Sequence, residues 1–156
     1  MKRTIWIILG IVVLLFVLPA IFTFASGGRT NPPVERQVNW DSPQTRELFY
    51  RACADCHSNE TKWPWYSVIP PFSALIVRDV NEGREKFNIS RMDMGEDAEE
   101  VAEVILEGEM PLPIYTLMHP EARLTDAERQ ALADGLLRTF GGEMGESEAH
   151  EEEDDD

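Results

Sequence analysis

The sequence predicts an all-α protein in which a membrane-spanning helix precedes one helical domain. Three observations favour this fold class. An apolar run without a charged side chain opens the chain. Apolar residues recur at helical spacing further on, and no convincing run of alternating apolar and polar residues predicts a strand. The length of 156 residues suits one domain of ordinary size.

Charge is spread unevenly along the chain, whose formal net charge is −15. Residues 1–25 carry +2 and residues 143–156 carry −9. We expect an anchor at 1–25, a linker at 26–40, a folded domain at 41–142 and a disordered acidic tail at 143–156. The acidic balance excludes a nucleic-acid-binding protein, because phosphate neutralisation requires clustered Lys and Arg.

The N-terminal apolar run extends from Ile5 to Ala25. As a helix it is about 31 Å long, which matches the hydrocarbon core of a bilayer. Pro19 is expected to kink it. Lys2 and Arg3 precede the run, so the positive-inside rule keeps the N-terminus in the cytoplasm and exports the rest of the chain.

A cleaved signal peptide is the alternative interpretation, with Thr23 and Ala25 as the small residues before the cleavage site. The run is longer than an ordinary signal-peptide core, which favours an uncleaved anchor. Beyond it, glycines and prolines at 27–33 predict a linker that leads away from the membrane surface.

Four helices are expected in the soluble part, each from an apolar stripe and a start or stop signal. They are a helix from Ser42 to Cys53, one over 72–85, one from Gly95 to Gly108, and one from the capping box of Thr125 and Glu128 to Gly141-Gly142. Their inward faces carry Leu48, Phe49, Ala52, Ala74, Leu75, Val77, Val80, Ala98, Val101, Ala102, Ile105, Ala131, Leu132, Leu136 and Phe140. Short helices with long, proline-rich connections predict that another group fills the centre.

The chain contains two cysteines, and both lie in the segment Cys53-Ala54-Asp55-Cys56-His57. This is the attachment pattern of c-type haem. Two thiols at this spacing reach the two vinyl groups of one haem, and the imidazole of His57 then lies beneath the iron as its proximal ligand. The sequence therefore predicts one covalently attached haem.

The cysteine pair has three other interpretations. A thioredoxin-like redox dithiol requires a strand–helix setting, which the sequence does not show. A zinc site would need distant ligands, and only His119 and His150 are left to supply them. A plain disulfide in an exported protein is the third.

A second axial ligand is expected from far along the chain. Met110 is favoured, because it follows a predicted helix and Pro111 stiffens the backbone beside it. His/Met ligation favours reduced iron and raises the reduction potential. His119 is the alternative and would give a bis-His iron of lower potential, and an open sixth position is a further one.

Side chains near the motif offer contacts to the porphyrin. Trp63, Trp65 and Tyr66 follow the attachment site closely, so we expect them to pack against the haem. Arg78 and Arg84 flank an apolar helix face and are candidates to pair with the haem propionates. Ordinary core packing and solvated arginines are the alternatives.

The sequence resembles the haem-binding domain family of small bacterial membrane-anchored c-type cytochromes. The matching stretches are NPPV at 31–34, CADCHSNETKWPWY at 53–66, DVNEGREKFN at 79–88, GEMP at 108–111 and HPEARLTDAER at 119–129. The resemblance implies a cytochrome-c-like helical domain around one covalent haem, with His57 as proximal and Met110 as distal ligand. It places the anchor in the bacterial inner membrane and the domain on the periplasmic side.

Electron transfer is the function expected from these features. The protein would be an anchored monohaem cytochrome that passes single electrons between redox partner proteins outside the cytoplasm. No catalytic acid–base pair stands out near the motif. The alternatives are a haem-based sensor or peroxidase-like enzyme with a displaceable sixth ligand, and an accessory subunit whose haem stabilises the fold.

Overall fold

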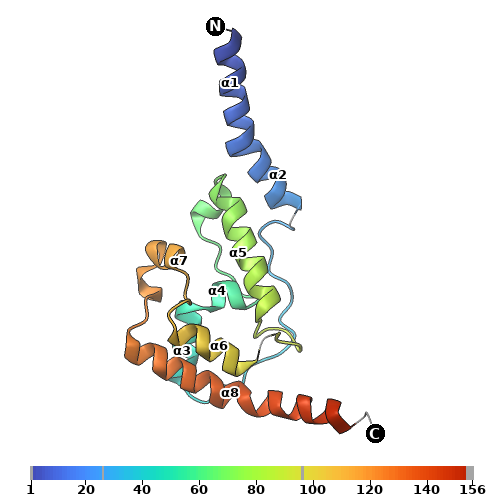
Figure 1. Cartoon of the computed structure of the whole chain (residues 1–156), viewed down its shortest axis with the longest axis vertical. Helices are drawn as coiled ribbons and strands as arrows, with labels where there is room; N and C mark the ends of the chain where they lie inside the picture. Colours follow the sequence, from blue (N-terminus) through green and yellow to red (C-terminus); the bar gives the residue numbers. More distant parts are fainter. Residues whose placement is uncertain (1, 26, 96, 154–156) are drawn as a thin grey trace.

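A long apolar helix projects from one end of a helical domain (Figure 1). The computed structural model describes residues 2–25, 27–95 and 97–153, with side chains as far as Gly141. Over these residues, β structure is limited to one isolated bridge between Phe87 and Gly95. The predicted all-α fold class is therefore confirmed.

The N-terminal helix consists of α1 (Lys2–Val12), a π-helical turn η1 (Val13–Val17) and α2 (Leu18–Ala25). The Leu18 N–H donates to the Val13 carbonyl, five residues back. This wider turn takes up the distortion that Pro19 imposes, since proline has no N–H and its ring crowds the preceding turn. An 18-residue stretch of Lys2–Ala25 has a mean hydropathy of 3.0, and the helix is long and apolar enough to cross a membrane.

Residues 30–40 of the predicted linker have no helix or strand, but they are not a free spacer. Beyond Arg29 the linker lies along the domain, where the Arg84 guanidinium donates to the Thr30 carbonyl at 2.9 Å and to Asn31 Oδ1 at 2.9 Å. The Asn59 side chain donates to the Pro33 carbonyl. These contacts are long-range, so glycine and proline content alone could not reveal them.

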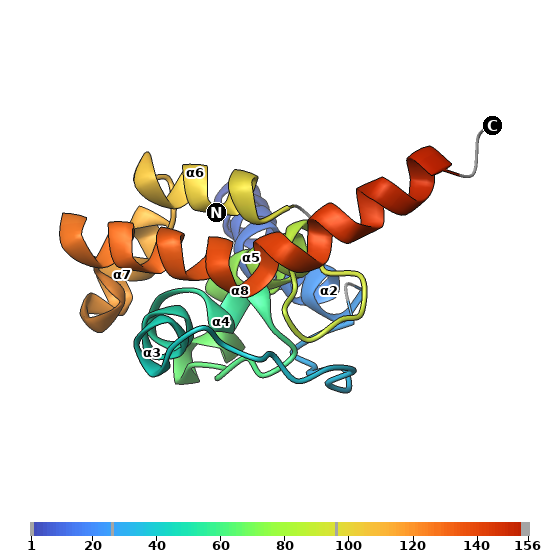
Figure 2. The ribbon, with the colours of Figure 1, turned by 90° about the horizontal axis from the view of Figure 1, so that it is seen from below.

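Three helices form the base of the domain: α3 (Pro43–Ala52), α6 (Ala98–Leu106) and α8 (Asp126–Glu153). Figure 2 shows α6 alongside α8, with α3 against the other side of α8. The predicted starts of α3 and α8 are confirmed by hydrogen bonds at their N-terminal caps. The Thr45 N–H donates to Ser42 Oγ, and the Thr125 N–H donates to the Glu128 carboxylate.

The predicted end of the last helix is wrong, because α8 continues past Gly141-Gly142 to Glu153. Gly141 is not among the glycines with positive φ, and six of the residues at 143–153 are Glu, which favours helix. The predicted disorder of 143–156 stays a prediction, since residues 154–156 and the side chains beyond Gly141 lie outside the described residues.

The attachment motif and its surroundings form the other half of the domain. α4 (Ala54–His57) follows α3 directly, and α5 (Phe72–Lys86) packs against it. The remaining elements are η2 (Trp65–Val68), α7 (Pro113–Met118) and η3 (Pro120–Ala122). On α5 the prediction is partly wrong: Val77 and Val80 are buried, whereas Leu75 is exposed and Ser73 takes a buried place.

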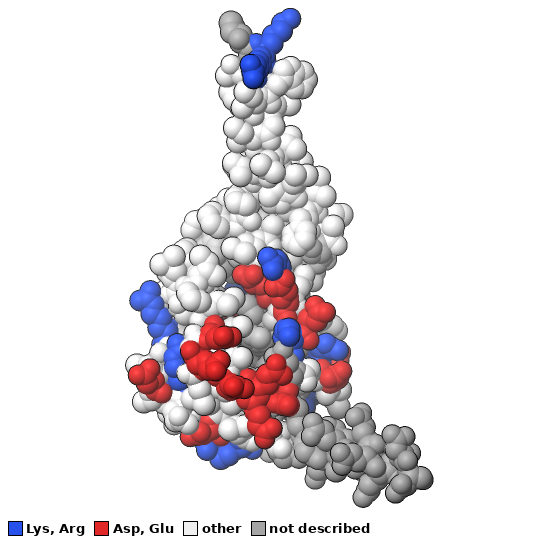
Figure 3. All heavy atoms as spheres, in the orientation of Figure 1, with Lys and Arg blue, Asp and Glu red and all other residues white. Residues whose placement is uncertain are grey.

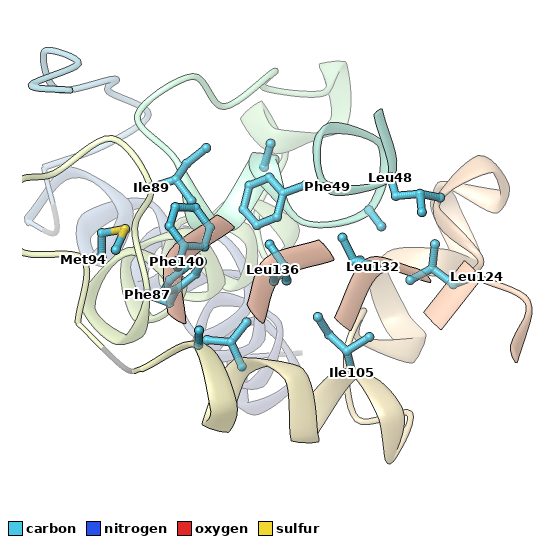
Figure 4. Close-up of a cluster of buried hydrophobic side chains, with 14 of the residues drawn as sticks. Leu48, Phe49, Phe87, Ile89, Met94, Ile105, Leu124, Leu132, Leu136 and Phe140 are labelled. Carbon is cyan, nitrogen blue, oxygen red and sulfur yellow. The ribbon is translucent and has the colours of Figure 1, made fainter. Parts of the chain in front are cut away.

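The core lies where α3, α6 and α8 meet the segment after α5. Phe49, Phe87 and Phe140 form its aromatic centre, with ring centroids 5.8 to 6.3 Å apart for the pairs that Phe87 makes (Figure 4). Leu132 and Leu136 of α8 are fully buried beside them. This core supports one wall of the cavity described next.

Candidate functional site

A cavity of about 750 Å³ opens between α3, α4, α5, α6 and the segment after α6. The volume lies in the range of small-molecule and cofactor sites. Both cysteines and His57 line it on one side. Met110 lines it from the segment that follows α6, so the structure brings together two parts of the chain that are far apart in sequence. Apolar side chains form much of the remaining wall: Phe49, Ala52, Phe87, Val101, Val104, Ile105, Pro111 and Leu112.

The two thiols face a dry environment. Burial raises the pKa of Cys53 to about 12, and the neighbouring Cys56 adds to this. Burial also raises the pKa of Cys56 to about 12, with a contribution from Asp55. Both side chains are therefore neutral thiols at physiological pH. The raised pKa values disfavour the thiolate form that a cysteine metal site requires.

His57 is oriented by a backbone carbonyl. Its Nδ1 lies 2.9 Å from the Phe87 carbonyl oxygen. Because a carbonyl can only accept, Nδ1 carries the proton and Nε2 is the basic nitrogen of the neutral ring. This is the tautomer that an axial imidazole ligand requires, and the hydrogen bond fixes the plane of the ring.

A buried polar network holds the carbonyl that orients His57. The Asn88 side chain donates to Asn59 Oδ1 at 2.9 Å, and the Asn59 N–H donates to Ser90 Oγ at 2.9 Å. The Ile89 N–H donates to the His57 carbonyl at 3.1 Å. Sequence reasoning missed this network. A signal for it was present, because Asn59 and Asn88 lie in the stretches that carried the family resemblance.

The segment that presents Met110 is fixed by α8. The Arg129 guanidinium donates to the Met110 carbonyl at 2.6 Å and to the Ile105 carbonyl at 3.0 Å. The N–H groups of Glu109 and Met110 both donate to the Val104 carbonyl. The segment is therefore tied to α6 and α8 at once, and Met110 is half-buried at the cavity wall.

His119, the alternative distal ligand, does not line the cavity. Its Nε2 lies 2.8 Å from the Tyr66 hydroxyl, and its Nδ1 lies 3.1 Å from the Glu121 carboxylate. Its ring stacks on Tyr115, with centroids 4.4 Å apart. The Tyr115 hydroxyl donates to Asp55 at 2.9 Å, so Tyr115 links α7 to the attachment motif, and His119 packs on the Tyr115 ring.

The aromatic side chains predicted to pack on the haem lie elsewhere. Trp65 is 76% exposed, Trp63 donates its indole N–H to Asn31, and Tyr66 contacts His119. None of the three lines the cavity. The turn after His57 leads the chain away from the cavity, so closeness in sequence does not become closeness in space. Phe49, Phe87 and Tyr115 supply the aromatic wall instead.

The two arginines proposed for the propionates are engaged in other contacts. Arg84 donates to the carbonyls of Ser58 and Thr30, so it joins the attachment loop to the extended N-terminal segment. Arg78 is exposed and pairs with Glu82 at 2.7 Å. At the cavity itself the charged lining residues are Lys86 and the acidic Asp79, Glu82, Glu85 and Glu100. In Figure 3, acidic side chains gather over the part of the domain farther from the N-terminal helix.

The donor set at the cavity fits a haem. It offers two neutral thiols, an imidazole of fixed tautomer and a thioether around an apolar space. Among the residues that the structure describes, no three His, Cys, Asp or Glu side chains gather as a metal site. The zinc interpretation therefore lacks a ligand cluster in the described part of the chain.

The fold and the site together define a small helical protein that binds haem. The model of the haem-binding domain family matches residues 16–137, which include every residue of the candidate site, and the chain belongs to this family. No curated protein and no solved structure matches the chain.

Proposed function

We propose that the protein is a membrane-anchored monohaem c-type cytochrome that transfers single electrons outside the cytoplasm. The observation that carries this proposal is the single cavity in which Cys53, Cys56, His57 and Met110 meet. Each thiol would add across one vinyl group, with sulfur bonding to one carbon and the hydrogen going to the other. Such attachment would need no oxidant and would hold the haem permanently.

His57 and Met110 are the proposed axial ligands. The Phe87 carbonyl holds the His57 imidazole in the tautomer whose Nε2 can donate to iron. Met110 is supported by its place at the wall and by the Arg129 contact, which limits the movement of its backbone. Bound haem supplies a one-electron iron couple, and the surrounding Phe49 and Phe87 exclude water from it.

The proposed location follows from Lys2–Ala25, which is long and apolar enough to span a membrane. Lys2 and Arg3 favour a cytoplasmic N-terminus, so the domain faces the periplasm of a bacterial inner membrane. The redox partners would be proteins that reach the domain on that side.

A haemochrome assay tests covalent attachment. The full chain is expressed with a cytochrome c maturation system, denatured and extracted with acid solvent. We expect haem to stay with the polypeptide. The Cys53→Ala and Cys56→Ala variants should each have one thioether fewer, which the position of the haemochrome absorption maximum reports. Complete extraction of haem from the wild-type chain would contradict covalent attachment.

Carbon monoxide binding separates electron transfer from the sensor or peroxidase-like alternative. A reduced iron with two protein ligands is expected to bind carbon monoxide slowly, and Met110→Ala is expected to bind it readily. His119→Ala serves as the matched control, because His119 lies off the cavity. Fast binding by the wild-type protein would contradict the simple electron carrier.

A further inference from the structure

An uncharged segment of the domain exposes large apolar side chains. Residues 63–77 carry no charge, and they form η2 and the first part of α5. Five of their large hydrophobic side chains are exposed: Trp65 at 76%, Val68 at 55%, Ile69 at 39%, Phe72 at 56% and Leu75 at 41%. We call these five residues the apolar shoulder. Clustered apolar exposure of this kind marks an interaction surface.

The shoulder adjoins the N-terminal helix. Thr23 of α2 donates its hydroxyl to Ser73 Oγ of α5 at 3.3 Å, and Arg29 donates to Ser67 Oγ of η2 at 3.3 Å. Figure 1 shows the start of α5 beside the end of α2. In Figure 3 the uncharged surface of the N-terminal helix continues onto the adjoining part of the domain, and charged side chains begin beyond it.

The depth of this contact follows from helix geometry. A hydrocarbon core about 30 Å thick takes about 20 helical residues. Counted from Ile5, the first residue after the basic pair, the core ends near Phe24. Thr23 therefore lies at the outer membrane–water boundary. Because Ser73 accepts a hydrogen bond from Thr23, Phe72 and its neighbours lie at the same depth. Tryptophan is enriched at this depth, which suits Trp65.

We propose that the apolar shoulder inserts into the outer leaflet and is a second membrane contact of the domain. The occupant of this surface is lipid, because the surface is continuous with the helix that the proposed function places in the bilayer. This inference rests on that anchor. The shoulder and α2 together fix the domain at one orientation, where a single helix alone would let it rotate.

The orientation sets the height of the cavity above the membrane. Glu82 of the cavity lining follows Phe72 by ten residues on α5. At about 1.5 Å per residue, the helix carries it roughly 15 Å along the axis. α5 leads away from the N-terminal helix in Figure 1, so the acidic side of the cavity stands clear of the lipid headgroups. A redox partner can reach it from the side or from the aqueous phase.

Spin labels on single added cysteines test the proposal in the full-length holoprotein. The chain is reconstituted in vesicles of phosphatidylcholine and phosphatidylglycerol, with labels at Trp65→Cys, Val68→Cys and Phe72→Cys. Met92→Cys is the matched control, since Met92 is 72% exposed in the segment between α5 and α6. Phe16→Cys marks the membrane helix. Collision rates with oxygen and with a water-soluble nickel chelate are then measured.

We expect the ratio of oxygen to nickel collisions at the three shoulder sites to exceed that at residue 92 several-fold. Ratios equal to that of residue 92 would overturn the proposal. Low collision rates with both reagents would also overturn it, because they indicate cover by a second copy of the chain. Three sites are used so that a variant that fails to attach haem does not decide the result.

Two further readouts distinguish failure of the shoulder from failure of the proposed function. A water-exposed label at residue 16 means that the anchor itself is wrong. Labelling of the wild-type chain means that Cys53 or Cys56 is not in a thioether. If both readouts agree with the proposed function and the shoulder sites are water-exposed, only the shoulder proposal fails.

Discussion

Gly83 of α5 packs directly on the backbone of Cys56. A β-carbon on Gly83 would lie 2.8 Å from the Cys56 carbonyl oxygen and 2.9 Å from its Cβ. Both are fixed atoms of the attachment motif, so neither can move aside without moving the motif. Glycine at this position lets α5 close one side of the cavity against α4.

Gly83→Ala is therefore expected to destabilise the holoprotein by about 1–3 kcal/mol, the usual cost of overpacking. It should also lower the yield of attached haem, because the two helices must separate. Denaturant unfolding and haem per polypeptide measure the two effects. Gly141→Ala is the control, since its added Cβ meets nothing within 4 Å. Equal stability of the two variants would contradict the close packing.

Arg129→Ala is expected to loosen the Met110 segment. Its loss leaves the carbonyls of Met110 and Ile105 without their side-chain donor, which costs about 1–3 kcal/mol. If that cost weakens the proposed iron–thioether bond, the affinity of the reduced protein for carbon monoxide should rise about 5- to 150-fold. Arg138→Ala, which removes a surface pair with Asp41, is the control. Identical affinities in both variants would mean that Arg129 acts on stability alone.

Glu128 is expected to make stability depend on pH in acid. The Thr125 N–H, then the Arg51 side chain, lower its pKa from 4.5 to about 2. A lowered folded-state pKa stabilises the folded state above the unfolded value, and this contribution is lost as pH falls from about 4.5 to about 2. Glu128→Gln should flatten the unfolding free energy in this window, whereas exposed Glu47→Gln should not. Parallel curves for all three proteins would contradict the assignment.

Asp79 is expected to tune the reduction potential. Burial raises its pKa, Glu82 raises it further and Arg78 opposes them. With haem bound as proposed, this carboxylate at the cavity would stabilise oxidised iron, so the potential would fall as pH rises through that pKa. Asp79→Asn should raise the potential at neutral pH by on the order of 1 kcal/mol, or about 40 mV. Glu103→Gln, which lies off this cavity, is the control for potentiometric titration. An unchanged pH dependence in Asp79→Asn would refute the role.

Local chemistry explains which parts of the fold were predictable. Ser42 and the Thr125–Glu128 pair act on N–H groups within three residues, so the starts of α3 and α8 follow from short sequence signals. The attachment motif is equally local. The end of α8 was not predictable from its glycines, because a glycine stops a helix only where it adopts a left-handed conformation.

The walls of the site required the structure. Gly83, Tyr115 and Arg129 act through neighbours that are distant in sequence, and none has a spacing that distinguishes it from an ordinary helix residue. The same reason explains why Trp63, Trp65 and Tyr66 do not line the cavity, although they follow the attachment motif closely in sequence. Arg84 was predicted as a candidate partner of the haem propionates, but in the structure it donates to backbone and side-chain groups of the chain itself.

The hydrogen bonds from Arg84 to Thr30 and Asn31 limit how far the domain can move from the N-terminal helix. Only residues 26–29 lie between α2 and that point, and such a stretch extends at most about 14 Å. Under the proposed function, this short connection would keep the domain close to the membrane surface, unlike a carrier on a long tether. Redox partners would then meet it through diffusion of the protein in the plane of the membrane and through their own movement.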